Sequence, residues 1–206
     1  MNANKEKLLT LIAEKFFKEG FYKTSMDEIA SDLHISKKTI YKYFSSKEEL
    51  LYDLIKNFLL TCRNDIDLVV NSRQNAVYKV VAILDTIKRI CMHFSDKWLQ
   101  DIRIAHPSVW KTIEDFRSQM IINNFSKIFS QGIQEGYIID VPPPIALTIF
   151  VSSIRSIVNP AFILDNSFSV KEAIDHTFKI FFSGIFTDKG RNILLKLTNQ
   201  KEQVIP

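Results

Sequence analysis

Three Ser-x-x-Glu sequences place the strongest constraint on how this 206-residue chain can fold. They begin at Ser25, Ser46 and Ser169, and each precedes apolar residues at helical spacing. In such a capping box the serine side chain accepts from a backbone N–H of the first turn, and the glutamate accepts from the N–H of the serine. Each box therefore predicts a helix start. The chain holds only five glycines for tight turns, so we expect an all-α fold.

Three short helices and the start of a long fourth are expected in about the first 55 residues. The first covers residues 5–18 with a wide apolar stripe and ends before Gly20. The second begins at about Met26, and the third follows the N-cap candidate Ser36 after a very short turn. The fourth begins in the box at Ser46. Short helices at this spacing predict a helix-turn-helix unit.

The third of these helices has two chemically different sides. Helical spacing places Ile40 and Phe44 on one side, flanked by Thr39 and Tyr43, where they can pack against the first two helices. The other side can contact phosphates and base edges in a major groove. It carries Lys37, Lys38, Tyr41 and Lys42.

Basic residues are concentrated locally, although residues 1–60 hold ten lysines and nine acidic residues. Four lysines and no acidic residue lie between Leu33 and Lys47. Lys37 and Lys38 stand in a first helical turn, as does Lys47, where the helix dipole disfavours a cation by a few tenths of a kcal/mol. A DNA phosphate bound at the helix start would make the lysine favourable there, because the ammonium and the free backbone N–H groups would both contact the anion. The alternative interpretation is a solvated lysine surface.

These residues resemble the N-terminal domain of TetR-family regulators. The resemblance covers residues 5 to about 55 and is carried by Gly20-Phe21, Thr24-Ser25, Ile29-Ala30, Ser36 to Phe44 and Ser46 to Leu51. It implies a homodimer, each subunit having a DNA-binding domain (1–50) and a larger helical ligand-binding and dimerisation domain (51–206), with a fourth helix over about 47–70 connecting them.

The same resemblance implies roles for individual residues. Tyr41 and Lys47 correspond to phosphate contacts, and Thr24 and Ser25 to backbone anchors at the start of the second helix. The groove-facing residues are Lys37, Lys38, Thr39 and Lys42. With the flanking Ser36 and Tyr43, the predicted DNA-binding set is Thr24, Ser25, Ser36, Lys37, Lys38, Thr39, Tyr41, Lys42, Tyr43 and Lys47.

Two positions depart from the family pattern. His34 stands where the family commonly has glycine in a left-handed turn, a conformation that His tolerates better than most residues. We interpret it as a turn residue, with a phosphate contact as the alternative. Asp27 occupies a position that is often basic in the family. It either complements the N-terminal helix dipole or accepts from a cytosine amino group.

Longer helices are expected after about residue 75, over 75–95, 107–135, 144–164 and 169–186. The stretch from Ile145 to about Asn159 is apolar on nearly every side, which predicts burial all round, and Pro160 should kink or end it. With the helix after Ser169, it suggests an intersubunit four-helix bundle; the alternative is that both are internal core. Candidate dimerisation residues are Phe150, Ile154, Ile157, Phe178, Phe181 and Phe182.

A ligand cavity is implied only by the resemblance, since most aromatic residues of 75–135 are expected to be core. The candidates for its lining are His93, Trp98, His106 and Trp110. No histidine has a metal-ligand partner three or four residues later, and the two cysteines have no CxxC spacing. We therefore expect no metal and no cofactor.

The leading functional hypothesis is a repressor that binds a pseudo-palindromic operator and is released by a small apolar or amphipathic ligand. An activator would have the same sequence features. The alternative from another class is a helical small-molecule or lipid carrier bearing a homeodomain-like module. The sequence holds no nucleophile–base pair and no phosphate-binding glycine loop, so we do not expect an enzyme. The polar N-terminus and short apolar runs predict a soluble, cytoplasmic protein without a membrane span.

Overall fold

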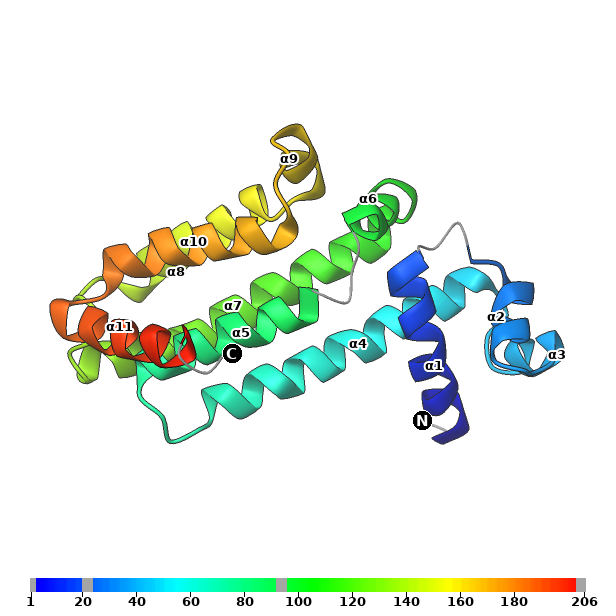
Figure 1. Cartoon of the computed structure of the whole chain (residues 1–206), viewed down its shortest axis with the longest axis horizontal. Coiled ribbons are helices and arrows are strands. Elements are labelled where there is room, and N and C mark those ends of the chain that lie inside the picture. The colour runs from blue at the N-terminus through cyan, green and yellow to red at the C-terminus, as the bar shows by residue number, and fades with distance from the viewer. Residues whose placement is uncertain (1–2, 20–23, 92–95, 203–206) are drawn as a thin grey trace. The chain divides into compact units, whose positions relative to one another are not determined.

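The computed structural model describes residues 3–19, 24–91 and 96–202. Within them lie eleven helices, and Ile138 and Phe186 form an isolated antiparallel bridge. The all-α expectation is confirmed (Figure 1). No helix in these ranges combines the length and apolar character needed to cross a bilayer.

The chain folds into two compact units, of which the first holds Met1–Cys62 and Ile90–Asp115. It contains the first four helices of the chain and a later helix that begins after residue 95. Their bounds are α1 (Ala3–Glu19), α2 (Met26–Asp32), α3 (Lys37–Tyr41), α4 (Lys47–Val70) and α6 (Asp96–Ala105). α4 extends beyond Cys62, so this helix has residues in both units.

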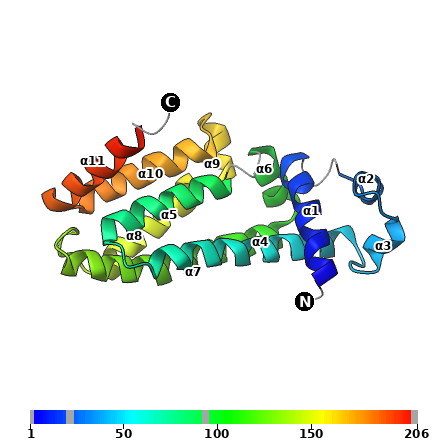
Figure 2. The same cartoon turned by 60° about the horizontal axis from the view of Figure 1, so that its bottom comes forward.

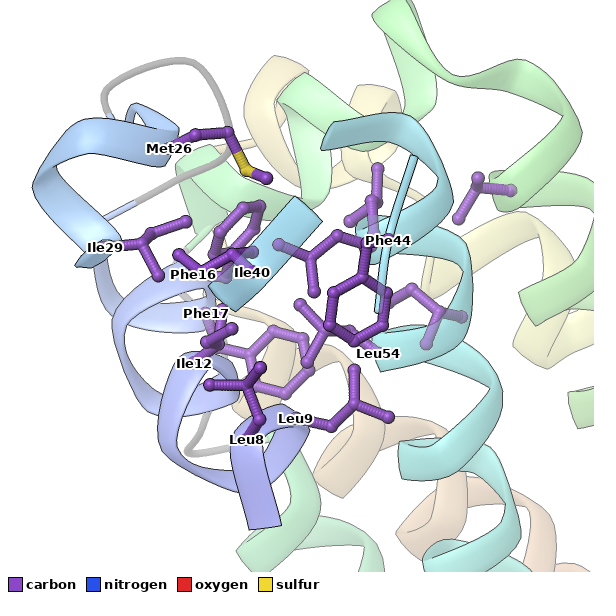
Figure 3. Packing of buried hydrophobic residues seen from close by; sticks show 14 of the residues in the cluster. Leu8, Leu9, Ile12, Phe16, Phe17, Met26, Ile29, Ile40, Phe44 and Leu54 are labelled. Atoms are coloured by element: carbon purple, nitrogen blue, oxygen red, sulfur yellow. The ribbon is translucent and has the colours of Figure 1, made fainter. Parts of the chain in front are cut away.

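One hydrophobic core holds the first unit together (Figure 3). Phe16 on α1, Ile40 on α3 and Leu50 on α4 are each 0% exposed. Trp98 and Ile102 on α6 join the same core, and the Trp98 and Phe17 rings meet edge to face at 5.3 Å. The packing unit therefore includes residues 90–115, beyond the division expected at residue 50, because these side chains are buried there and α6 contacts α1.

The second unit holds Arg63–Arg89 and Phe116–Pro206. In it α8 and α10 lie side by side (Figures 1 and 2). Its core is aromatic: the Phe150 ring stacks on Phe181 at 4.6 Å and meets Phe178 edge to face at 5.1 Å. The remaining helices of the chain are α5 (Ala76–Cys91), α7 (Pro107–Gln134), α8 (Pro143–Ile157), α9 (Pro160–Asp165), α10 (Val170–Ile185) and α11 (Asp188–Glu202).

The helix starts follow the capping signals. Ser25 and Glu28 form a reciprocal box at α2, and Ser169 and Glu172 form another at α10. Of the two hydrogen bonds expected in the box at Ser46, only the one accepted by the Ser46 hydroxyl is present. Its hydroxyl accepts from the Glu49 N–H at 3.0 Å, but the Glu49 carboxylate accepts from the N–H of Ser45 at 2.7 Å.

One expectation about the C-terminal helices needs correction. α8 is not buried all round in the protomer, because Ile145 and Ile149 are each 54% exposed. Pro160 does interrupt the helix as expected: α8 ends at Ile157, and α9 begins at Pro160. The helices α6 and α11 were not predicted from the sequence.

Candidate DNA-binding surface

α3 separates an apolar side from a polar side, as its periodicity predicts. Ile40 and, just beyond the helix, Phe44 are 0% exposed in the core of the first unit (Figure 3). The opposite side is open to solvent, where Tyr41 is 45% exposed. The exposed residues are Ser36, Lys37, Lys38, Thr39, Tyr41 and Lys42. We call this set, with Asp27 of α2, the α3 surface.

Backbone capping fixes the starts of α2 and α3. Ser36 Oγ accepts from the Thr39 N–H at 3.1 Å and lies 2.8 Å from the Thr39 hydroxyl oxygen. Ser25 Oγ accepts from the Glu28 N–H at 3.1 Å. Ser36 and Ser25 therefore have structural roles, while both remain exposed and able to approach DNA.

The turn between α2 and α3 passes through a left-handed residue. His34 has φ +51°, which agrees with the turn role expected for it. The Ile35 N–H donates to the Ala30 carbonyl at 3.0 Å and closes the turn. The tight reversal keeps α2 and α3 in contact, which is the arrangement of a helix-turn-helix (Figure 2).

An ion pair that the sequence did not predict links the first turns of α2 and α3. Lys37 Nζ lies 2.8 Å from Asp27 Oδ2, and both side chains are exposed. The hydrogen bond to Asp27 raises the pKa of Lys37 above its ordinary value. The two residues are ten positions apart, so no local helical spacing could have indicated their contact.

Lys47 differs from the lysines of α3 because it is partly buried. It lies in the first turn of α4, with its ammonium 6.0 Å from the centre of the Phe16 ring. Burial lowers its pKa, while Glu48 and Glu28 oppose the shift. A partly desolvated ammonium at a helix start is suited to bind an anion, as a phosphate contact requires.

Two members of the predicted DNA-binding set are less available than expected. Thr24 is 0% exposed, so a DNA contact by its side chain would require its surroundings to open. Tyr43 is only partly exposed and packs against the core of the first unit, with Lys42 Nζ 5.9 Å from its ring centre. Tyr43 thus helps to hold the end of α3 against the core, and the contact of Thr24 and Tyr43 with DNA stays a prediction.

The candidate ligand-lining residues that the structure describes belong to the first unit. Trp98 is 1% exposed and Trp110 is 9% exposed in the core of the first unit. His106 is partly buried between α6 and α7, and burial lowers its pKa. His93 lies outside the described residues. A role of these residues in ligand binding stays a prediction.

The candidate dimerisation residues are mostly interior to the protomer. Only Ile157 and Phe181 are partly exposed. The remaining four are at most 5% exposed and pack within the second unit: Phe150, Ile154, Phe178 and Phe182. The same helices expose other apolar residues, since Ile180 of α10 is 74% exposed and Ile145 and Ile149 of α8 are each 54% exposed. Sequence periodicity could not separate these two sets, because α8 is apolar on most sides.

Four buried uncharged polar side chains in the second unit were also missed. Thr86 and Thr177 donate to carbonyls one turn earlier, and Ser118 accepts from Arg155 Nε at 2.9 Å. Asn124 is 3% exposed, and its amide donates to the Met120 sulfur at 3.8 Å. A polar residue on an otherwise apolar helical stripe was the signal that could have indicated Asn124.

Taken together, a capped three-helix unit and a third helix with exposed lysines and a tyrosine define a helix-turn-helix DNA-binding protein. Residues 4–54 match the family of bacterial regulatory proteins described as the tetR family. The N-terminal part of the chain is therefore similar to the DNA-binding domain of TetR-family transcriptional regulators. The match covers the unit that carries the α3 surface.

Relatives along most of the chain support this assignment. The uncharacterized HTH-type transcriptional regulator YvaF of Bacillus subtilis is 23% identical over 183 residues, covering 87% of this chain and 95% of YvaF. The HTH-type transcriptional repressor KstR2 of Mycobacterium tuberculosis is 28% identical over 143 residues, covering 66% of this chain and 70% of KstR2.

A solved structure shows the same fold. A regulator from Saccharomonospora viridis in complex with choline superposes with a TM-score of 0.69 at 14% identity, covering 89% of this chain and 98% of that protein. At this identity the likeness extends to the fold alone.

Proposed function

We propose that this protein is a homodimeric repressor that binds a pseudo-palindromic operator through the α3 surface and is released by a small molecule. The α3 surface carries the proposal, because it presents three lysines and Tyr41 outward while Ile40 and Phe44 anchor the helix from behind. The name of the relative KstR2 supports a repressor rather than an activator.

Selection from a pool of randomised DNA duplexes tests this function. The wild-type protein should enrich an inverted repeat with half-sites about 10 base pairs apart, or a multiple of that spacing, because two-fold related recognition helices enter successive major grooves. Lys38→Ala should enrich no sequence while remaining folded. Absence of any enriched sequence with the wild-type protein would support the alternative, a helical small-molecule carrier.

The exposed faces of α8 and α10 support the homodimer. Ile145 and Ile149 lie four residues apart on one side of α8, and Ile180 of α10 is exposed as well. Large exposed apolar side chains on two helices that pack together favour an interface, and a two-fold axis would bring the same faces of two protomers together.

A matched pair of variants tests this interface. Ile180→Asp buries an uncompensated charge in each half of the dimer, a change that costs about 3–5 kcal/mol per group. We expect monomers in sedimentation equilibrium. Leu68→Asp is the control, because Leu68 is 73% exposed on α4 and Ile180 is 74% exposed on α10. Equal dissociation of both variants would contradict the assignment of the interface.

The interior of the second unit supports a small effector. Its phenylalanine core includes the buried polar residues Thr86, Ser118, Asn124 and Thr177, and apolar sites with a few polar groups are the common form of ligand site. The complex of the structural relative with choline is in keeping with a small-molecule ligand. α4 and α7 each have residues in both units, so a change in the second unit can reach Lys47 along one helix.

The effector proposal is tested with the molecule that co-purifies with the protein, identified by native mass spectrometry. Adding it should weaken binding to the selected duplex, and DNA should weaken its binding by the same factor. Asn124→Leu should reduce the response while leaving DNA affinity unchanged. A saturating effector that leaves the DNA affinity of the wild-type protein unaltered would contradict release by a ligand.

A further inference from the structure

Asp27 places a carboxylate on a surface that otherwise presents only lysines and neutral groups. It lies in the first turn of α2, and its side chain is 72% exposed. Its partner Lys37, in the first turn of α3, is 47% exposed. The pair is therefore open to a competing ligand.

A phosphate and a base edge place different demands on this pair. A carboxylate only accepts hydrogen bonds, so Asp27 repels phosphate, and Lys37 must leave Asp27 to give its full charge to the DNA backbone. An ammonium has three donors, so Lys37 can keep one bond to Asp27 and still donate to O6 and N7 of a guanine. Exposed ion pairs are weak, so Asp27 reduces the affinity of Lys37 for phosphate without abolishing it.

We propose that Asp27 is a specificity-determining residue, which keeps Lys37 from phosphates on DNA of arbitrary sequence and presents it to a guanine in the operator. The inference rests on the proposed function, because it requires the α3 surface to enter the major groove. Asp27 thus lowers the affinity for DNA of arbitrary sequence more than the affinity for the operator. The ratio of operator affinity to sequence-independent affinity therefore rises.

Salt dependence gives the expected size of the effect. Removing the carboxylate with Asp27→Asn frees one lysine for a phosphate, which steepens the dependence of log K on log salt by about 0.9. A fourfold rise in salt should then weaken binding of Asp27→Asn to arbitrary DNA about threefold more than binding of the wild-type protein.

The experiment compares two duplexes of equal length by fluorescence anisotropy. One is the sequence that the wild-type protein selects from a randomised pool, and the other is its scrambled version. Asp27→Asn should bind the scrambled duplex about threefold tighter at low salt, with a smaller change on the selected duplex. The control is Asp165→Asn on α9, which makes the same change in net charge at an exposed residue of the second unit.

A double-mutant cycle separates positioning of Lys37 from direct repulsion. In a Lys37→Met background the effect of Asp27→Asn on the scrambled duplex should shrink to the part that direct repulsion of phosphate by Asp27 contributes. If it persists in full, Asp27 acts by its own charge and the proposed role is overturned. Equal tightening on both duplexes, or no change on either, overturns it too. Failure of the wild-type protein to select any sequence would instead contradict the proposed function, and this inference with it.

Discussion

Ile40 anchors the exposed helix α3 to the first unit, so its truncation should destabilise that unit measurably. Its side chain is 0% exposed. Ile40→Ala removes three carbons, which at about 0.8 kcal/mol each is a transfer loss of about 2.4 kcal/mol. The residual cavity raises the expected total to about 3 kcal/mol, within the usual range of about 2–5 kcal/mol. Ile40→Val should cost only about 1 kcal/mol.

Tryptophan fluorescence offers a local assay of this loss. The chain has two tryptophans, and both Trp98 and Trp110 lie in the core of the first unit. Urea unfolding followed by their emission should show a midpoint lowered by roughly 1–2 M for Ile40→Ala, for a urea dependence of about 2 kcal/mol per M.

Lys38→Ala is the matched control on the other side of α3. Lys38 is exposed, so the free energy of unfolding of Lys38→Ala should stay within about 0.5 kcal/mol of the wild-type value. A loss below about 1 kcal/mol for Ile40→Ala would refute the packing account of α3. So would a large loss for Lys38→Ala.

Three further changes probe the backbone and the titratable groups. His34→Gly should raise the free energy of unfolding of the first unit by about 0.5–1 kcal/mol, because φ is +51° there; a urea midpoint equal to or below wild type would contradict this. Gly190→Ala should lower the thermal midpoint measured by circular dichroism, because its Cβ would meet the Tyr137 carbonyl oxygen; an unchanged midpoint would show that the backbone can shift freely. Burial, assisted by Lys47, holds the pKa of His106 below 6.5, so its stabilisation is present above pH 6.5 and is lost as pH falls through the lowered pKa. The urea midpoint should therefore fall between about pH 7.5 and about pH 5, and His106→Gln should reduce the fall; equal slopes would exclude His106 as the cause.

The N-terminal helices could be predicted because their signals are local. Ser25 with Glu28 and the N-cap Ser36 fix helix starts within a few residues of sequence, and periodicity separates Ile40 from its exposed neighbours. α6 and α11 were not predicted because they lack such local signals. α6 is only ten residues long and follows no capping box, and α11 is a largely polar segment with no capping box.

Tertiary contacts account for the rest. Trp98 and Trp110 are candidates for a ligand-lining role that stays a prediction, and their place in the core of the first unit depends on long-range packing that no local pattern indicated. Phe150 and Ile149 are adjacent and equally apolar, yet one is 0% and the other 54% exposed. Only the positions of neighbouring helices decide which of them faces the protomer core. The Asp27–Lys37 pair likewise depends on the reversal at His34.

The central claim, that the α3 surface binds DNA, is tested most directly by the affinity of matched lysine variants for the selected duplex. Lys38→Gln and Lys56→Gln each remove one exposed charge from the first unit, and Lys56 lies on α4 about 14 Å along the helix from Lys47. We predict that Lys38→Gln weakens binding by about 1–3 kcal/mol at fixed salt. Lys56→Gln should stay close to wild type. Equal losses for the two variants, or wild-type affinity for Lys38→Gln, would contradict the claim.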